Sequence, residues 1–522
     1  MYSIPYTNVE AQGDLQNRAE LLFTRLEGPM YQPAHIFTVE SGGWPGDWEG
    51  RTILALTMLT QITGRQPIYL DEIVEKLEDH VNEKGYLRQV LPDGDVDEQQ
   101  LSGHSWLLRG LCEYYLLHKE EAAISKPVLH RIEAIVQNLF VPAIGRYTEY
   151  PIRPEDRVTD GKESGHIGKK VGHWYLSSDT GCAYIPLDGL SQAYVLLVQE
   201  SDDTSLVEQL KTLLTEMVNG FYAIPFLEIS VQTHATLTGC RGILRLYEQD
   251  HDPEKLAFVE KIFALYQAEG MTANYANYNW FGRPEWTEPC AVIDSFMVAT
   301  QLFQHTAKPE YATLAQRILY NGLYAGERAN GGFGTDTCLG AAEKPASHIL
   351  ACSSYEAYWC CSMRGGEGLA AVSRYSLLEQ DDHTALILYP VSGIYTVCGI
   401  KLRVDTQYPL DDTVTIHVLE NPQNLPLAIR MQDMPYVTPQ CGHSWDAQAI
   451  PQAGEMQTWH MQSVLHTEAP VGNHAIAGSI LYYGNMILGT DKDTLAFTPL
   501  MLRYQQTEEE IQSKKLRIIF LN

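Results

Sequence analysis

The chain is short of basic residues for its size. It has 37 lysines and arginines against 65 aspartates and glutamates, which gives a formal net charge of −28 over 522 residues. Nucleic acids require a basic surface to neutralise their phosphates, so this balance argues against a nucleic-acid partner. It also argues against anionic membrane surfaces and favours neutral ligands over anionic ones.

Long hydrophobic runs and a leader are missing as well. No stretch reaches the roughly 18 apolar residues of a membrane helix, and the N-terminus, MYSIPYTNVEAQGDLQNRAELL, lacks a basic region followed by an apolar one. Neither a membrane span nor an export signal is therefore expected. The ten cysteines form no small-domain framework. We expect them to be reduced and the protein to be cytoplasmic.

The order of hydrophobic patterns predicts a mostly α-helical architecture. From about Leu15 to Tyr375, apolar residues recur at helical spacing in blocks such as RTILALTMLTQITG and CAVIDSFMVATQLFQHT. Ten or more paired helices with short connections indicate a solenoid or a closed α/α barrel. Because no motif repeats at a fixed period, the barrel is favoured.

The last third of the chain follows a different period. After about Ser376, apolar and polar residues alternate in short segments such as IKLRVDTQYP and TVTIHVLE, which Pro, Gly, Asp and Asn interrupt. This pattern predicts an antiparallel β-sandwich. We expect two domains, a helical barrel over residues 1–375 and a β-sandwich over residues 376–522.

Polar and aromatic residues gather where the loops between the helices are expected. Rings that stack on sugar C–H faces and planar polar groups that bind hydroxyls are what a pocket for a neutral polyol needs. The predicted substrate is therefore a carbohydrate, as an oligosaccharide or glycoconjugate. The candidate substrate contacts are Asp47, Trp48, His104, His173, His234 and Trp280. Taken singly, a histidine of this kind is more often structural than a ligand contact.

Two adjacent cysteines, Cys360 and Cys361, stand in the run EAYWCCSMRGGEG, and Glu288 and Cys290 precede them in EWTEPC. Neighbouring cysteines form a disulfide only with strain. Three thiols and a carboxylate are a ligand set that Zn²⁺ accepts. The alternative is that the cysteines are small apolar core residues. Because the sequence has no CxxC or HxxxH motif that would support a metal site, the spacing alone favours core residues.

Three segments in this order resemble a known family: TEPCAVIDSFMVATQLFQHT, AQRILYNGLYAG and YWCCSMRGGEGLAAVSRY. They are similar to the core signature of glycoside hydrolase families 127 and 146, the β-L-arabinofuranosidases and their relatives. The resemblance implies a zinc-dependent retaining glycosidase on an (α/α)₆ barrel followed by a β-sandwich. It implies that Glu288, Cys290, Cys360 and Cys361 bind Zn²⁺ and that Cys360 is the nucleophile. His104 and His234 match histidines that contact the sugar.

The acid/base residue departs from the family pattern. The family places a catalytic glutamate upstream of the Glu-x-Cys motif, but residues 271–281 contain no carboxylate. Glu285 is the best candidate, because it lies in the loop, and Glu269 and Glu367 are weaker ones. Two other functions stay open: a sugar epimerase, isomerase or lyase that uses His104 and His234, and a catalytically inactive glycan-binding relative. The sequence also leaves homo-oligomer formation open.

Overall fold

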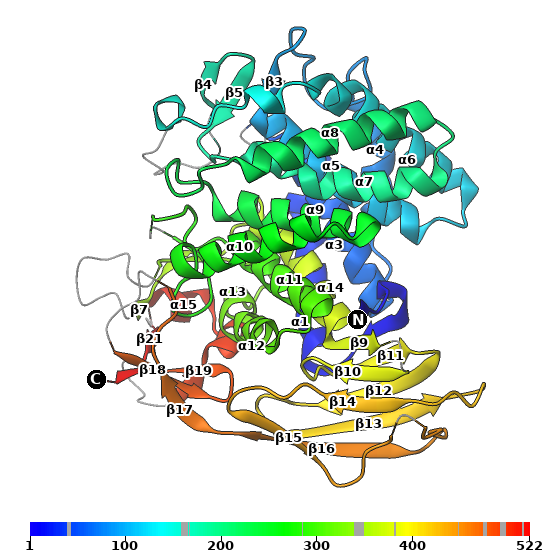
Figure 1. The fold of residues 1–522 in the computed structure, drawn as a ribbon, viewed down its shortest axis with the longest axis vertical. Helices are drawn as coiled ribbons and strands as arrows, with labels where there is room; N and C mark the ends of the chain where they lie inside the picture. Colours follow the sequence, from blue (N-terminus) through cyan, green and yellow to red (C-terminus); the bar gives the residue numbers. More distant parts are fainter. Residues whose placement is uncertain are drawn as a thin grey trace.

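The computed structural model describes residues 1–522 except 39–42, 158–164, 166, 284–285, 339–348, 381–382, 447, 473–477, 491–496, 514–515 and 522. Helices fill most of the chain up to Ser376, and strands follow (Figure 1). The long helices are α1 (Gly13–Leu26), α3 (Asp47–Thr63), α5 (Glu98–Leu117), α6 (Ala122–Ile135), α7 (Pro186–Glu200), α8 (Thr204–Tyr222), α9 (Thr233–Asp250), α10 (Pro253–Glu269), α11 (Pro289–Thr306), α12 (Pro309–Ile318) and α14 (Cys361–Ser376).

Alternate helices form a closed inner ring. Helix α3 packs on α5, α5 on α7, α7 on α9, α9 on α11 and α11 on α14, and α14 returns to α3. These inner helices are buried over most of their length, whereas α6, α8 and α10 each expose one face, and α12 is also mostly buried. This arrangement is the predicted (α/α)₆ barrel. Within the described part of the chain, no helix has both the length and the apolar character to cross a membrane.

Glycine sets the closest approach within the ring. A Cβ atom on Gly50 of α3 would lie 2.2 Å from the backbone nitrogen of Leu107 on α5, and one on Gly103 of α5 would lie 2.3 Å from the carbonyl oxygen of Pro45. Only glycine fits positions at which two backbones come this close. Glycine at these positions therefore allows the backbones of α3 and α5 to pack directly against each other near the start of α3.

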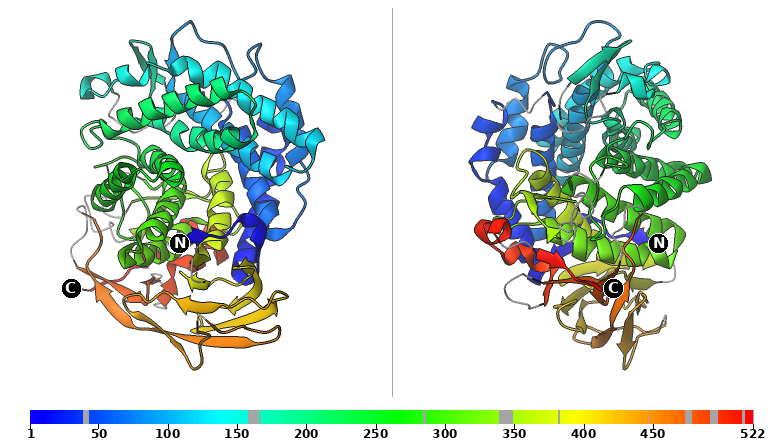
Figure 2. Two further views of the ribbon diagram at one scale, coloured as in Figure 1. Left: turned by 45° about the vertical axis from the view of Figure 1, so that its right-hand side comes forward. Right: turned by 90° about the vertical axis from the view of Figure 1, so that its left-hand side faces the viewer.

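The large sheets lie at one end of the barrel, whereas a small sheet of β3 (Val96–Asp97), β5 (Trp174–Ser177) and β4 (Ile167–Val171) lies at the other (Figures 1 and 2). A six-stranded sheet has the order β15-β16-β13-β12-β11-β2, with β15 (Val437–Cys441), β16 (Met456–Ser463), β13 (Thr413–Glu420), β12 (Ile400–Thr406), β11 (Gly393–Val397) and β2 (Val9–Ala11). Strand β13 alternates buried and partly exposed residues along TVTIHVLE. The β domain predicted from this alternation is confirmed.

Two further sheets complete the β domain. One has the order β1-β9-β10-β14, with β1 (Tyr2–Ser3), β9 (Leu377–Gln380), β10 (Thr384–Ile387) and β14 (Ala428–Met431). The other has the order β17-β18-β19-β21-β7, with β17 (Leu465–Glu468), β18 (Ser479–Tyr483), β19 (Met486–Thr490), β21 (Leu516–Ile518) and β7 (Ile349–Leu350). Most described pairings are antiparallel, but β10 and β14 are parallel.

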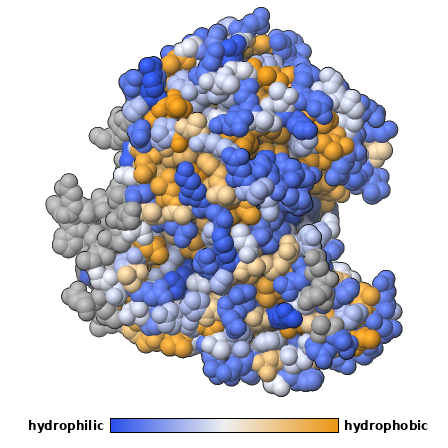
Figure 3. Space-filling view, viewed as in Figure 1, coloured by the Kyte–Doolittle hydropathy of each residue, from blue (hydrophilic) through white to orange (hydrophobic). Residues whose placement is uncertain are grey.

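The N-terminal strands tie the two parts of the chain together. Strand β1 pairs with β9, and β2 pairs with β11, so residues 2–11 extend sheets formed mostly by residues after 376. The expected division at residues 375 and 376 stays a prediction. Polar residues cover most of the surface seen in Figure 3, and apolar ones lie there in separate groups.

Candidate metal centre

The N-termini of two neighbouring inner helices supply the candidate ligands. Glu288 is the N-cap of α11 and Cys290 lies in its first turn, while Cys360 is the N-cap of α14 and Cys361 is its first residue. Because α11 and α14 pack against each other in the ring, segments about 70 residues apart meet here. The helix dipoles add positive potential at this point, which favours carboxylate and thiolate groups.

The four side chains form one compact cluster. One ligand atom from each of Glu288, Cys290, Cys360 and Cys361 lies within 4.8 Å of the others. The Sγ atoms of Cys360 and Cys361 are 3.3 Å apart, and those of Cys290 and Cys361 are 3.6 Å apart. These separations exclude disulfides, which require about 2.05 Å. Two thiolates on a tetrahedral Zn²⁺ would be about 3.8 Å apart for Zn–S bonds of about 2.3 Å, so the cluster fits the ion.

The charge balance of the cluster also fits a cation. Burial alone would raise the pKa of Cys290, but hydrogen bonds from Cys360 and Cys361, together with His234 and Arg51, lower it well below its usual value. The pKa values of Cys360 and Cys361 are raised well above theirs, mainly by the hydrogen bond to Cys290 for Cys360 and by burial for Cys361. A divalent cation would ionise all three sulfurs.

Arg51 connects the cluster to the start of α3. Its Nη1 lies 3.5 Å from Cys290 Sγ, and its Nε donates a hydrogen bond of 2.8 Å to Asp47 Oδ1. Its guanidinium carbon lies 4.2 Å from the centre of the Trp106 ring. The predicted contact Asp47 is thus a buried partner of Arg51, one step from the thiolates.

His234 is placed beside the carboxylate of the cluster. It lies in the first turn of α9, where its Nδ1 is 3.4 Å from Glu288 Oε1 and its Nε2 is 3.4 Å from Asp294 Oδ2. Its ring stacks on Trp106 with centroids 5.7 Å apart. Burial lowers its pKa, but Glu288 and the neighbouring acidic groups outweigh burial and raise it. Asn277 Oδ1 accepts a 2.7 Å hydrogen bond from the backbone nitrogen of Glu288.

The other predicted contacts lie in different surroundings. His104 is fully buried on α5, where its Nε2 accepts a 3.0 Å hydrogen bond from the Leu87 backbone and its Nδ1 lies 2.8 Å from the carbonyl oxygen of Gln100. Burial lowers the His104 pKa to about 4, so the ring is neutral. Both of its nitrogens are engaged, which favours a structural role.

The remaining three predicted side chains divide between core and surface. Trp48 and Trp280 are almost completely buried, and their indole nitrogens have no hydrogen-bond partner among the described residues. The side chain of His173 is 45% exposed and lies 3.2 Å from Asp95. The structure therefore brings Asp47 and His234 to the cluster, and their role as substrate contacts stays a prediction, as it does for the others.

Of the three acid candidates, the structure describes Glu269 and Glu367. Glu285 lies outside the described residues. Glu367 is buried inside the ring, where Arg109 Nη2 and Arg241 Nη2 bond to its Oε1 at 2.6 and 2.5 Å. Glu269 is the last residue of α10. Arg364 Nη1 also contacts Oε2 of Glu367, so three arginines engage Glu367 and make it unsuited to donate a proton to a substrate.

Sequence analysis did not identify three residues that shape the cluster: Arg51, Asp294 and Asn277. Asp294 accepts hydrogen bonds from Thr238, Arg241 and Arg364 behind His234. The spacing of Asp47 and Arg51, four residues apart at a helix start, is the one local signal that could have paired them. Their proximity to cysteines more than 200 residues away depends on closure of the ring.

Comparison with known proteins agrees with this architecture. Residues 190–374 match the family described as the catalytic domain of β-L-arabinofuranosidase, glycoside hydrolase family 127. A solved family 127 β-arabinofuranosidase superimposes with a TM-score of 0.62 at 13% identity, covering 94% of this chain and 85% of its own. A family 127 β-L-arabinofuranosidase from Geobacillus stearothermophilus gives 0.61 at 16% identity, covering 93% and 86%.

A third structure, titled a glycoside hydrolase, gives a TM-score of 0.62 at 11% identity and covers 94% of this chain and 83% of its own. A search of curated proteins gives no match. At these identities the structural likeness establishes the fold. Together with the match over residues 190–374, it confirms the resemblance that the three sequence segments predict.

Proposed function

We propose that this chain, whose residues 190–374 match the catalytic domain of glycoside hydrolase family 127, is a zinc-dependent retaining glycoside hydrolase. Its substrate would carry a terminal furanoside or related sugar, with a β-L-arabinofuranoside as the first candidate. The observation that carries the proposal is the cluster of one carboxylate and three thiol sulfurs at the N-termini of α11 and α14.

Glu288, Cys290, Cys360 and Cys361 would hold the zinc ion. When bound, the ion supplies the positive charge that keeps the sulfurs ionised at neutral pH. The buried positions of Glu288, Cys290 and Cys361 suit them to hold the metal, whereas Cys360 is the partly exposed member of the four. This partial exposure of the residue supports the choice of Cys360 as the nucleophile.

The Cys360 thiolate attacks the anomeric carbon of the sugar, so that a C–S bond forms and the glycosidic C–O bond breaks. The leaving oxygen takes a proton from an acid. Water then attacks the same carbon, the C–S bond breaks, the thiolate is released, and the proton of the water passes to the base. Two displacements at one carbon retain the anomeric configuration.

Glu285 is the proposed acid and base. Of the carboxylates beside the cluster, Asp47 is paired with Arg51, and Asp294 is bonded to Arg241 and Arg364. Both are held in place by hydrogen bonds and ion pairs with arginine, which either carboxylate would have to break to reach a leaving group. Glu285→Gln should slow substrates with poor leaving groups much more than activated aryl glycosides.

The two alternative functions receive no specific support. Proton transfer by His104 and His234 would require free ring nitrogens, and both nitrogens of His104 are engaged inside the barrel. A catalytically inactive glycan-binding relative is distinguished from the hydrolase by the activity panel described next. A cytoplasmic location and homo-oligomer formation stay predictions.

The test is an activity panel of nitrophenyl furanosides and pyranosides, measured with and without a chelator, together with metal analysis of the purified protein. Cys360→Ser should abolish turnover while the fold survives. Cys441→Ser, a partly exposed cysteine in the β domain, is the matched control and should keep full activity. Full activity in Cys360→Ser would refute the assigned nucleophile, and a protein without zinc would remove the basis of the proposal.

A further inference from the structure

Two exposed aromatic residues directly precede the proposed nucleophile. Tyr358 is 38% exposed and Trp359 is 46% exposed, and Cys360 follows them at the start of α14. Trp359 is the only exposed residue among the nine tryptophans, all of which lie in the described part of the chain. A pair of large rings left in solvent beside a proposed nucleophile is a candidate surface for a ligand.

The turn that carries the two rings is anchored by its backbone. The nitrogen of Ala357 donates a 2.7 Å hydrogen bond to the carbonyl oxygen of Phe333. The carbonyl oxygen of Ala357 accepts bonds of 3.3 Å and 3.2 Å from the nitrogens of Cys360 and Ser362. Because the aromatic pair lies inside this turn, its backbone is fixed relative to the sulfur that follows.

Buried aromatic residues support the pair from beneath. The centre of the Tyr358 ring lies 6.1 Å from that of Trp48 and 5.0 Å from that of Trp359, with an interplanar angle of 84° to the Trp359 ring. Tyr31 Oη donates a 2.9 Å hydrogen bond to the carbonyl oxygen of Tyr358. Trp48 and Tyr31 are only 2% and 0% exposed. Rings held by such neighbours lose little freedom when a ligand binds.

The same support continues to the thiolate cluster. Trp48 follows Asp47 in the first turn of α3. Asp47 accepts the 2.8 Å hydrogen bond from Arg51, whose Nη1 lies 3.5 Å from Cys290 Sγ. The aromatic pair and the cluster therefore lie at the same end of the barrel and share one wall.

The burial of the cluster limits where a substrate would lie. Glu288, Cys290 and Cys361 are buried, and Cys360 is the partly exposed member of the four. We therefore expect a sugar to approach the cluster from the side of Cys360. In a displacement at the anomeric carbon, the leaving oxygen lies opposite the attacking sulfur. The leaving group would then project away from the cluster towards the solvent, where the aromatic pair is exposed.

We infer that Tyr358 and Trp359 bind the sugar unit on the leaving-group side of the cleaved bond, by stacking on the C–H face of its ring. The inference rests on the proposed function, because it takes Cys360 as the nucleophile. The two rings carry no charge, which suits a neutral sugar. The substrate is then a saccharide of at least two units, and Trp359 determines the preference for the leaving group.

Two substrates isolate this contact. Methyl and cyclohexyl β-L-arabinofuranoside carry the same terminal sugar and alcohols of similar acidity, but only the cyclohexyl group presents a six-membered ring of C–H bonds. Trp359→Ala should lower the ratio of kcat/KM for the cyclohexyl glycoside to that for the methyl glycoside by about five- to tenfold, as expected for the loss of one stacking partner. A merely structural role of Trp359 would lower both values alike and leave the ratio unchanged.

Tyr2→Ala is the matched control for an exposed aromatic residue. Tyr2 is 60% exposed and pairs with Glu379, which lies just beyond the C-terminal end of α14. The cluster lies at the other end of this helix, whose 16 residues span about 24 Å. This variant should leave the ratio of the two kcat/KM values unchanged.

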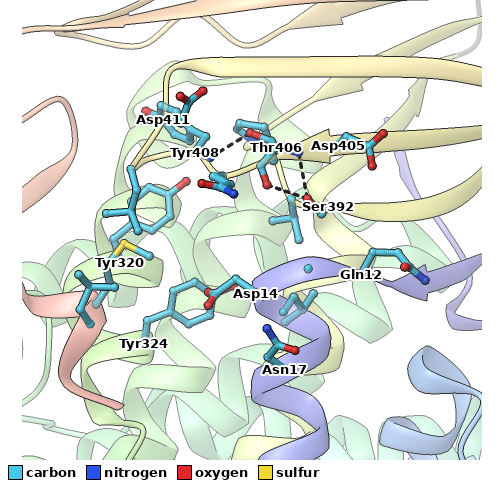
Figure 4. A pocket seen from close by; sticks show the side chains of 18 of the residues that line it. Gln12, Asp14, Asn17, Tyr320, Tyr324, Ser392, Asp405, Thr406, Tyr408 and Asp411 are labelled. Atoms are coloured by element: carbon cyan, nitrogen blue, oxygen red, sulfur yellow. Dashed lines mark hydrogen bonds between the residues drawn. The ribbon is translucent and has the colours of Figure 1, made fainter. Parts of the chain in front are cut away.

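Quenching of tryptophan fluorescence by acrylamide tests binding without turnover. Trp359→Phe should remove most of the quenchable emission, because Trp359 is the only exposed tryptophan. The cyclohexyl thioglycoside of the same sugar, which resists hydrolysis, should shield Trp359 from acrylamide, and the methyl thioglycoside should shield it less. A ligand in the cavity of about 810 Å³ between the barrel and the β domain would not shield it, because no tryptophan is among the described residues that line this cavity (Figure 4).

The outcomes separate this inference from the proposed function. Unchanged quenching with the cyclohexyl thioglycoside, or an unchanged kcat/KM ratio in Trp359→Ala, would overturn the aromatic pair as a binding surface, while turnover of the glycosides would uphold the hydrolase. Equal shielding by both thioglycosides would move the contact to the terminal sugar and overturn the leaving-group assignment. Shielding of Trp359 without turnover of either glycoside would uphold the binding surface and overturn the hydrolase.

Discussion

Replacing Arg51 with methionine should destabilise the barrel strongly, because it leaves a buried carboxylate without its cation. The side chains of Arg51 and Asp47 are only 6% and 8% exposed, and their hydrogen bond is 2.8 Å long. Breaking a buried pair by removing one partner costs about 3–5 kcal/mol. Methionine retains much of the apolar stem, so most of the loss reports the unpaired Asp47 carboxylate beside the Cys290 sulfur.

A double-mutant cycle separates charge from packing. Asp47→Asn in the Arg51→Met background removes the stranded charge and should recover most of the lost stability. Urea unfolding followed by tryptophan fluorescence is a suitable measurement, because most tryptophans lie before residue 376. The surface pair Glu72 and Lys76 has the same four-residue spacing, with side chains 46% and 43% exposed.

Lys76→Met is therefore the matched control and should change the unfolding free energy by less than about 1 kcal/mol. Two results would refute the reasoning. One is a cost of Arg51→Met as small as that of the control. The other is a double variant no more stable than Arg51→Met alone, which would show that the loss comes from the contacts of Arg51 with Trp106 and Cys290 and not from the carboxylate.

Three other changes test neighbouring parts of the structure. Gly50→Ala should cost at least about 1–3 kcal/mol in thermal or urea unfolding, because the added Cβ would lie 2.2 Å from the α5 backbone, whereas Gly442→Ala, with nothing within 4 Å, should be neutral. Burial raises the pKa of Glu49 from 4.5 to about 7, so the folded state holds its proton more tightly, and the unfolding free energy should fall by about 3 kcal/mol as pH rises from 4.5 to 7. Glu49→Gln should flatten this dependence of the unfolding free energy on pH, and an unchanged dependence would contradict the raised pKa. Cys290→Ser should lower both zinc per chain, measured by elemental analysis, and the melting temperature, and retention of both would argue against a metal ligand.

The local patterns of the sequence determined the two kinds of structure in this chain. Helical spacing in segments such as RTILALTMLTQITG predicts inner helices, and alternation in TVTIHVLE predicts β13, since both patterns follow from the geometry of a single element. The cluster of Glu288, Cys290, Cys360 and Cys361 could also be predicted from the sequence, because Glu288 and Cys290, like Cys360 and Cys361, lie within three residues of each other at the start of a helix. The match to a known signature identified the two pairs as one set.

Contacts between distant segments were decided only by the tertiary structure. Strands β1 and β2 extend sheets built from residues after 376, and nothing in their short sequences specifies those partners, because strand pairing depends on hydrogen bonds between segments far apart. His104 lies in a segment whose sequence suits a loop contact, yet it is a buried residue of α5 with both nitrogens engaged. Arg51 reaches Cys290 across 239 positions because closure of the helical ring brings α3 and α11 together around α14. A sequence lists the charges and thiols of a chain, but only the closed barrel determines which of them share the same buried space and shift one another's pKa.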